Sequence, residues 1–213
     1  MAMPDAIDRH RRTDSPMLSG VFLCPADRAA ELSELLAEDL DVHLIAPAPF
    51  AVPDHPRLNV RAVELRSGLM PEIPCYVEGV GPKELSATGA FGKIRCGGAT
   101  IPSVAELAAY ITMAARLALP FKATAGLHAA VRGWESTDGI PHHGFLNVLL
   151  GVARGITGGN VAEVLGSTDA SAIAAEVLEI SDDLAVPLRY VFRSFGSCDT
   201  TRPVNDAREL GLL

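Results

Sequence analysis

The sequence predicts an α/β fold of the (β/α)8 TIM-barrel type, incomplete or open, with about seven parallel strands and the first strand missing. Seven short apolar runs rich in β-branched residues lie along the 213 residues, and helical patterns fall between several of them. Strands that alternate with helices form parallel sheets. No linker divides the chain, so we expect a helix or extension over residues 1–17 and one barrel-like domain over 18–213.

The expected strands are the seven apolar runs, each bounded by turn signals or by a helical pattern. In chain order they are 20–25, 41–48, 58–66, 74–79, 91–98, 120–128 and 188–198. A TIM barrel has eight strands, so the number is one short. The N-terminal segment supplies an irregular strand, the barrel is open, or a second subunit covers the gap.

The expected helices follow from apolar positions that recur at helical spacing. They are 27–38, 103–118, 144–154, 160–166, 169–179 and 203–210. The clearest begins at Ser103, which forms an S-x-x-E capping box with Glu106 directly after Pro102. The segment "GITGGN" follows a helix rather than a strand, so we interpret it as a helix–helix turn and not as a phosphate loop.

Composition restricts the location and the partners of the protein. Its mean hydropathy is +0.23, but it has no apolar run long enough to cross a bilayer. The N-terminal residues lack the apolar stretch of a secretory signal, so we expect a cytoplasmic protein. The net charge of −8 argues against nucleic acid or a membrane as partner, because either would require a basic surface.

The four cysteines predict neither a disulfide framework nor a zinc site. Cys24, Cys75, Cys96 and Cys198 are far apart and show no C-x-x-C spacing. Three of them lie in or beside apolar runs, which is typical of buried thiols. We expect no cofactor.

Polar residues alternate with apolar residues in "PFKATAGLH". Because successive side chains of a strand point to opposite faces, Lys122, Thr124 and His128 share one face, and the apolar residues between them pack beneath helices. The preceding strand places Lys93 and Arg95 on the same face. The polar face therefore points toward the barrel axis, and its charges must pair, reach water or bind a ligand.

Carboxylates on two earlier strands extend this polar set. Glu78 follows Tyr76 on the inner face of 74–79, and Glu64 on 58–66 is a further candidate. One interpretation is an ion network that fills the barrel. The other is a functional site, because barrel cores are usually layered with branched aliphatic residues and clustered charges on adjacent strands mark sites.

The two lysines suggest carbonyl chemistry. Lys93 and Lys122 lie at similar heights on neighbouring strands, which are ~4.8 Å apart. A nearby like charge and partial burial favour the neutral form of a lysine, which can attack a carbonyl carbon. The segment "PFKATAGL" also resembles the reactive-lysine strand of deoxyribose-phosphate aldolases, which carry a second lysine on an adjacent strand. This resemblance covers about eight residues.

The loops after the strands are expected to build the mouth of the site. The long loop 129–143 ends in His142 and His143, which with His128 are candidate acids or bases; a metal triad of the three is an alternative without specific spacing. His143 is also a candidate helix cap. The expected anion-binding residues are Arg95, Thr124, His143, Asn147, Ser194, Gly196 and Ser197, the last three in "SFGSCD" after the final strand.

Four segments together resemble a family of uncharacterised bacterial proteins over residues 18–213. They are "GKIRCGG", "PFKATAGLHAAVR", "HHGFLNVLL" and "SFGSCDTTRPVNDARELGLL". Members typically read R-T-G-G and T-A-G-L-H-H, whereas this chain has Cys96 and Ala129 at the variable positions. They also carry a D-D-A-x-x-F-P-P-G strand before the first helix, which is absent here. The resemblance implies a barrel that lacks its first strand, and no particular reaction.

These observations predict an enzyme that acts on a small anionic carbonyl compound by lyase or aldolase chemistry. Lys122 would form the imine, and Lys93 and Arg95 would lower the pKa of Lys122 or bind the anionic group of the substrate. Glu78, His128 and His142 would transfer protons. One alternative is an isomerase, cyclase or dehydratase that stabilises an enolate with the same cations. Another is a degenerate barrel that works as a binding or partner subunit. The exposed barrel edge favours a homodimer.

Overall fold

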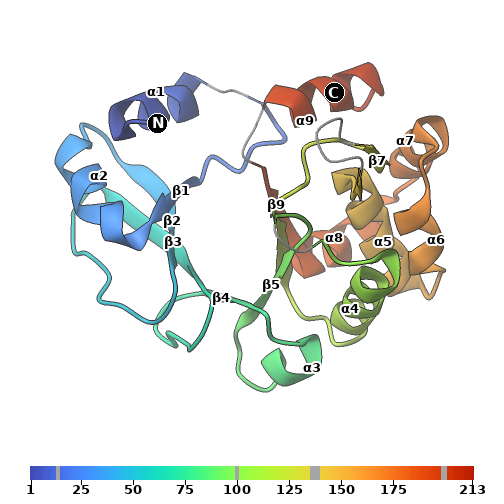
Figure 1. The fold of residues 1–213 in the computed structure, drawn as a ribbon, viewed down its shortest axis with the longest axis horizontal. Helices are drawn as coiled ribbons and strands as arrows, with labels where there is room; N and C mark the ends of the chain where they lie inside the picture. The colour runs from blue at the N-terminus through green and yellow to red at the C-terminus, as the bar shows by residue number, and fades with distance from the viewer. Residues whose placement is uncertain (13–14, 99–100, 135–139, 198–200) are drawn as a thin grey trace. The chain divides into compact units, whose positions relative to one another are not determined.

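The computed structural model describes residues 1–12, 15–98, 101–134, 140–197 and 201–213 (Figure 1). The chain forms two compact units. The first contains Met1–Gly79 and Gly89–Phe91, and the second contains Val80–Thr88 and Gly92–Leu213. The single domain expected over residues 18–213 stays a prediction.

The fold class expected from the sequence is confirmed. The described residues form an α/β fold with seven parallel strands joined by helices, consistent with an incomplete TIM-barrel-like fold. In the first unit the strand order is β1-β2-β3-β4, and in the second it is β5-β6-β9. The strands are β1 (Phe22–Pro25), β2 (Leu40–Ala46), β3 (Leu58–Leu65), β4 (Cys75–Glu78), β5 (Phe91–Arg95), β6 (Phe121–Thr124) and β9 (Phe192–Gly196).

The helices of the described chain include all those expected. The first unit has α1 (Met3–Arg12), a 3-10 turn η1 (Ala26–Arg28) and α2 (Ala29–Leu35). The second has α3 (Pro82–Leu85), α4 (Val104–Arg116), α5 (Phe145–Thr157), α6 (Val161–Gly166), α7 (Ala170–Leu178), α8 (Asp182–Val191) and α9 (Thr201–Glu209). An antiparallel pair, β7 (Gly133–Trp134) and β8 (Pro141–His142), lies in the long loop before α5.

The local signals for helix ends act as expected. At α4 the Ser103 hydroxyl accepts the Glu106 N–H at 3.2 Å, and the Glu106 carboxylate accepts the Ser103 N–H at 2.8 Å. The "GITGGN" segment is a helix–helix turn: α5 ends on Gly158 with φ +80°, and the side chain of Asn160 caps α6. This confirms that the glycines stop one helix before the next begins.

The last strand begins later than expected. Residues 188–191 complete α8, and only Phe192–Gly196 form β9. Residues 188–191 are helical because α8 has a stable start. Ser181 caps this helix by accepting the Leu184 N–H, and Asp182 and Asp183 complement its positive end. The β-branched run thus begins in a helix and becomes a strand where Phe192 pairs with Phe121.

Aromatic packing fixes the helix-facing side of the strands of the second unit. The ring of Phe121 lies 5.5 Å from the ring of Tyr110 on α4 and 5.5 Å from that of Phe192. The hydroxyl of Tyr110 lies so close to Gly92 that a Cβ there would clash with it. Phe121 and Ala123 are fully buried. The face of β6 that carries Phe121 is therefore the face that packs on α4.

None of the described helices has the length and apolar run needed to span a bilayer.

Candidate functional site

A row of polar residues crosses the three strands of the second unit. Lys122 on β6 is in register with Lys93 on β5 and with Ser194 on β9. Lys122 is only 2% exposed and Lys93 is 7% exposed. Since Phe121 packs on α4, the alternation of the strand directs Lys122 to the opposite face. The orientation expected from the sequence is found for this strand.

A second row lies one step nearer the carboxyl ends of the strands. Arg95 is in register with Thr124, and Thr124 with Gly196. The Arg95 side chain is exposed and turns toward its own loop, since a Cβ on Gly98 would come within 2.7 Å of a guanidinium nitrogen. The Thr124 hydroxyl donates to the Ile94 carbonyl at 3.4 Å. Arg95 thus presents a cation at the strand ends.

The loops that leave β5 and β6 touch backbone to backbone. A Cβ on Gly97 would lie 2.6 Å from the Gly126 Cα, and a Cβ on Gly126 would lie 2.8 Å from the Cys96 carbonyl oxygen. Ala125 has φ +61° and Gly126 has φ +70°. A left-handed alanine is strained, and strain of this kind is concentrated at functional sites. The strained turn begins three residues after Lys122.

His128 and Ser197 meet above this turn. The Nδ1 atom of His128 lies 3.1 Å from the Oγ atom of Ser197. The backbone N–H of Ala130 donates to the Asp206 carboxylate of α9 at 2.8 Å. The loops after β6 and β9 therefore hold each other through side chains, as expected for residues at the carboxyl ends of neighbouring strands.

His143, a predicted anion-binding residue, makes hydrogen bonds within the fold through both ring nitrogens. Its Nε2–H donates to the Pro102 carbonyl at 2.7 Å, and its Nδ1 accepts from the Arg132 guanidinium at 3.2 Å. The side chain is buried. Burial and the positive charge of Arg132 lower the pKa of His143 from its usual value. The neutral ring therefore connects the α4 entry to the loop before α5.

Asn147, another predicted anion-binding residue, makes hydrogen bonds within the fold. Its Oδ1 accepts the Arg132 N–H at 2.7 Å, and its Nδ2 donates to the carbonyls of Val164 at 2.7 Å and Ser167 at 2.9 Å. The residue is fully buried. Gly144 is required beside it, because a Cβ there would clash with the Asn147 Oδ1. The residues of the "HHGFLN" motif thus hold the start of α5 against the segments around it.

We expect protonation of His143 to weaken the fold as the pH falls. Its folded pKa lies below the unfolded value, so below about pH 6.5 the unfolded chain binds more protons at this position. Stability is therefore full above the unfolded pKa and decreases as the pH falls toward the folded pKa, with a slope of up to about 1.4 kcal/mol per pH unit.

Urea unfolding at pH 7.5 and pH 5.5 measures this effect. The decrease in unfolding free energy should be smaller for His143→Gln than for the wild type, while His55→Gln, which removes an imidazole of the first unit, should keep the wild-type decrease. An identical pH dependence of His143→Gln and the wild type would contradict the assignment.

His142 and Glu78 are the remaining predicted site residues. His142 is half-buried in β8, where it pairs with Gly133. Glu78 is the last residue of β4 in the first unit and is half-buried. It stays a candidate proton shuttle.

The first unit contains a buried histidine–carboxylate pair that was not predicted from the sequence. Glu64 is 1% exposed, and its Oε1 lies 3.4 Å from the Nδ1 of His43. Tyr76 is in register with Glu64, and its ring lies 5.8 Å from that of His43. The signal was present, because His43 alternates with buried Val42 and Leu44 on β2.

The three described cysteines are buried thiols, as expected. Burial raises the pKa of Cys24 to about 11, that of Cys96 to about 12, and that of Cys75 above its usual value. Such thiols are poor nucleophiles at neutral pH. Cys198 lies outside the described residues. Within the described ranges no three His, Cys, Asp or Glu side chains gather as metal ligands.

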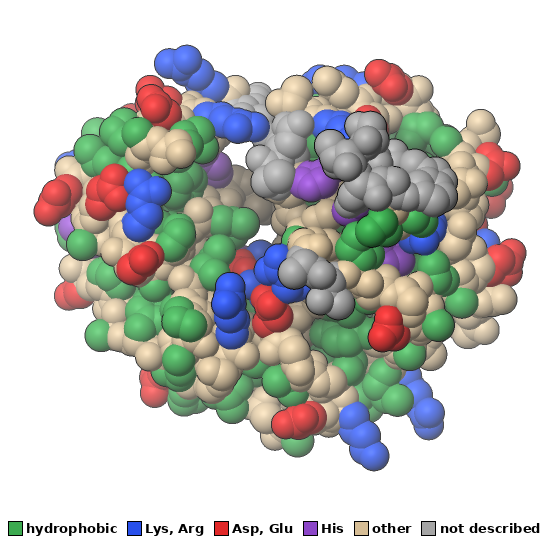
Figure 2. Space-filling view, viewed as in Figure 1, with side chains coloured by type: hydrophobic (Ala, Val, Ile, Leu, Met, Phe, Trp, Pro, Cys, Tyr) green, Lys and Arg blue, Asp and Glu red, His purple; other side chains and the backbone are tan. Residues whose placement is uncertain are grey.

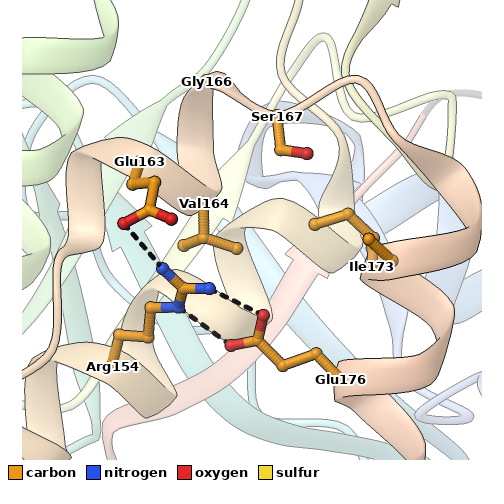
Figure 3. Close-up of a pocket in the computed structure, with 8 residues that line it drawn as sticks. Arg154, Glu163, Val164, Gly166, Ser167, Ile173 and Glu176 are labelled. Atoms are coloured by element: carbon orange, nitrogen blue, oxygen red, sulfur yellow. Dashed lines mark hydrogen bonds and ion pairs between the residues drawn. The ribbon is translucent and has the colours of Figure 1, made fainter.

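The surface shows mixed charge and one pocket away from the lysines. Acidic and basic side chains are interspersed on the face seen in Figure 2. A pocket of about 380 Å³ lies among α5, α6 and α7, and Figure 3 shows Arg154 between two carboxylates there. Arg154 donates to Glu176 at 2.8 and 2.9 Å and pairs with Glu163 at 3.4 Å. Arg154 thus pairs with both carboxylates and joins the three helices.

The fold and the site define an α/β protein of parallel, barrel-like strands with a buried lysine pair on β5 and β6. Comparison with protein-family models, with curated proteins and with solved structures found no match.

Proposed function

We propose that the protein is an enzyme that acts on a small anionic carbonyl compound by lyase or aldolase chemistry, with Lys122 as the imine-forming residue. The observation that carries this proposal is the register of two buried lysines on adjacent strands. The whole chain has only three lysines, and the third, Lys83, is exposed on α3. Burial of two amines side by side is costly unless they pair with polar groups of the protein or bind a ligand, and clustered charges on adjacent strands mark functional sites.

The chemistry follows from the amine. The Lys122 nitrogen attacks the carbonyl carbon and water leaves to give an iminium. The bond between the α and β carbons then breaks: its electrons form an enamine, while the β-hydroxyl loses its proton and becomes the carbonyl of the first product. Protonation of the enamine and hydrolysis by water release the second product and restore the Lys122 amine. Lys93 and the exposed Arg95 supply positive charge for an anionic group of the substrate. Thr124, Ser194 and Gly196 occupy the same two rows and are the candidate neutral ligands.

The same row also supports a second function, in which the cations stabilise an enolate without an imine, as in an isomerase, cyclase or dehydratase. Lys122→Arg separates the two, because a guanidinium keeps the charge but does not form an imine.

A degenerate barrel that binds a partner is a third candidate function. Among the described strands, β1 and β9 each pair on one side only, which supports our proposal of a homodimer. We also retain a cytoplasmic location as a proposal.

Borohydride trapping tests the imine. We expect a stable mass increase on Lys122 when the protein is incubated with borohydride and pyruvate, glyoxylate or glyceraldehyde 3-phosphate, and no increase with Lys122→Met. Lys83→Met is the matched control and should trap as the wild type does. Peptide mapping locates the adduct. An adduct on Lys83 or on the N-terminal amine, or an unchanged yield in Lys122→Met, would refute the proposal.

A further inference from the structure

A serine and a histidine meet at the carboxyl ends of β6 and β9. His128 Nδ1 and Ser197 Oγ are 3.1 Å apart, although the residues are 69 positions apart in the chain. Both side chains are half-buried, so neither is enclosed in the core. A hydroxyl within hydrogen-bond distance of an imidazole is the arrangement that activates serine as a nucleophile.

The two residues are held by independent features of the fold. Ser197 follows Gly196, which is in register with Thr124, so the end of β9 fixes its position. His128 follows the strained turn at Ala125 and Gly126, and the N–H of Ala130 is bound by Asp206. The backbone on both sides of the contact is thus anchored, which is a requirement for a preorganised reactive pair.

We propose that Ser197 and His128 form a nucleophile–base pair that transfers the acyl group of a small ester carrying an anionic group. This activity goes beyond the proposed function, because it uses a hydroxyl and an imidazole and does not require Lys122. The anionic preference rests on Arg95, whose exposed guanidinium lies at the carboxyl end of β5, the strand next to β6.

The proposed reaction is the hydrolysis of an ester in two steps, and it consumes one water molecule. As Ser197 Oγ bonds to the ester carbonyl carbon, its proton moves to His128 Nδ1. The tetrahedral adduct collapses, the bond to the alcohol oxygen breaks, and the alcohol takes that proton. Water then attacks the acyl-serine while His128 accepts one of its protons, and the acid leaves as Ser197 recovers its hydrogen. No oxidation or reduction occurs.

A fluorophosphonate probe tests the pair directly. In this reaction the serine oxygen bonds to phosphorus, fluoride leaves, and the proton passes to the histidine. We expect one label per chain, mapped to Ser197, and none in Ser197→Ala. His128→Gln should slow the labelling about 100-fold or more, since general bases contribute at least this factor. Ser171→Ala, which removes an exposed hydroxyl on α7, should label as the wild type does.

Turnover of two chromogenic esters tests the substrate class. Mono(4-nitrophenyl) succinate should be hydrolysed faster than 4-nitrophenyl acetate, and Arg95→Gln should remove this preference. The fluorophosphonate label maps to Ser197 and the borohydride adduct maps to Lys122, so failure of the imine and failure of the serine chemistry are distinguishable. A label on a residue other than Ser197, undiminished labelling of Ser197→Ala, or no labelling of the folded wild type would overturn the inference. If Ser197→Ala does not fold, His128→Gln decides, because it leaves the serine in place.

Discussion

Gly97→Ala is expected to destabilise the protein by about 3 kcal/mol or more. The added Cβ would lie 2.6 Å from the Gly126 Cα and 2.8 Å from the Gly126 nitrogen. Both obstacles are backbone atoms, so no rotamer change can relieve the overlap, and the loops after β5 and β6 must separate. Because these loops leave the strands of Lys93 and Lys122, we also expect the variant to lose imine trapping.

Gly166→Ala is the matched control for this prediction. It makes the same chemical change at the end of α6, where a Cβ meets no atom within 4 Å and φ is not positive. Its unfolding free energy in urea should differ from that of the wild type by less than about 1 kcal/mol. Equal stabilities of the Gly97 and Gly166 variants would show that the backbone contact is not a constraint.

Asn147→Asp should cost about 3 to 5 kcal/mol, the typical penalty for leaving a charge uncompensated in the interior. The amide Nδ2 donates to the carbonyls of Val164 and Ser167, and a carboxylate there would face both oxygens without a proton to share. The acceptor for the Arg132 N–H would remain. The expected decrease in unfolding free energy therefore reflects the loss of the two hydrogen bonds donated by Nδ2 and the burial of a negative charge.

The same substitution at Asn160 provides the comparison. Asn160 caps α6 by accepting the Glu163 N–H at 3.2 Å, and its contact is exposed. An aspartate is an equally good cap and favours the positive helix end, so Asn160→Asp should leave the urea midpoint unchanged or raise it slightly. If both aspartate variants are equally stable, Asn147 does not hold α6 to α5.

Local patterns predicted most of the elements. All seven expected strands formed, and the Ser103–Glu106 capping box marked the start of α4 correctly. The polar alternation in "PFKATAGLH" correctly predicted that Lys122 lies on the face opposite Phe121. These features depend on strand alternation and on contacts within a few residues, which sequence patterns record.

Contacts between distant segments were less predictable. His143 and Asn147 have residue types common in ligand sites, yet their polar atoms are bound by Pro102, Arg132, Val164 and Ser167. Glu64 was an expected inner residue, but its pairing with His43 was not predicted, because the two residues lie 21 positions apart on neighbouring strands.

The sequence alone determined that this chain forms strands with helices between them and that two of its three lysines alternate with apolar residues on neighbouring strands. Both follow from the period of apolar residues, which is a local property. The tertiary structure alone decided which polar residues are available for chemistry. His143 and Asn147 are occupied by structural hydrogen bonds, whereas His128 meets Ser197 from 69 residues away, because only the folded backbone brings such groups within bonding distance.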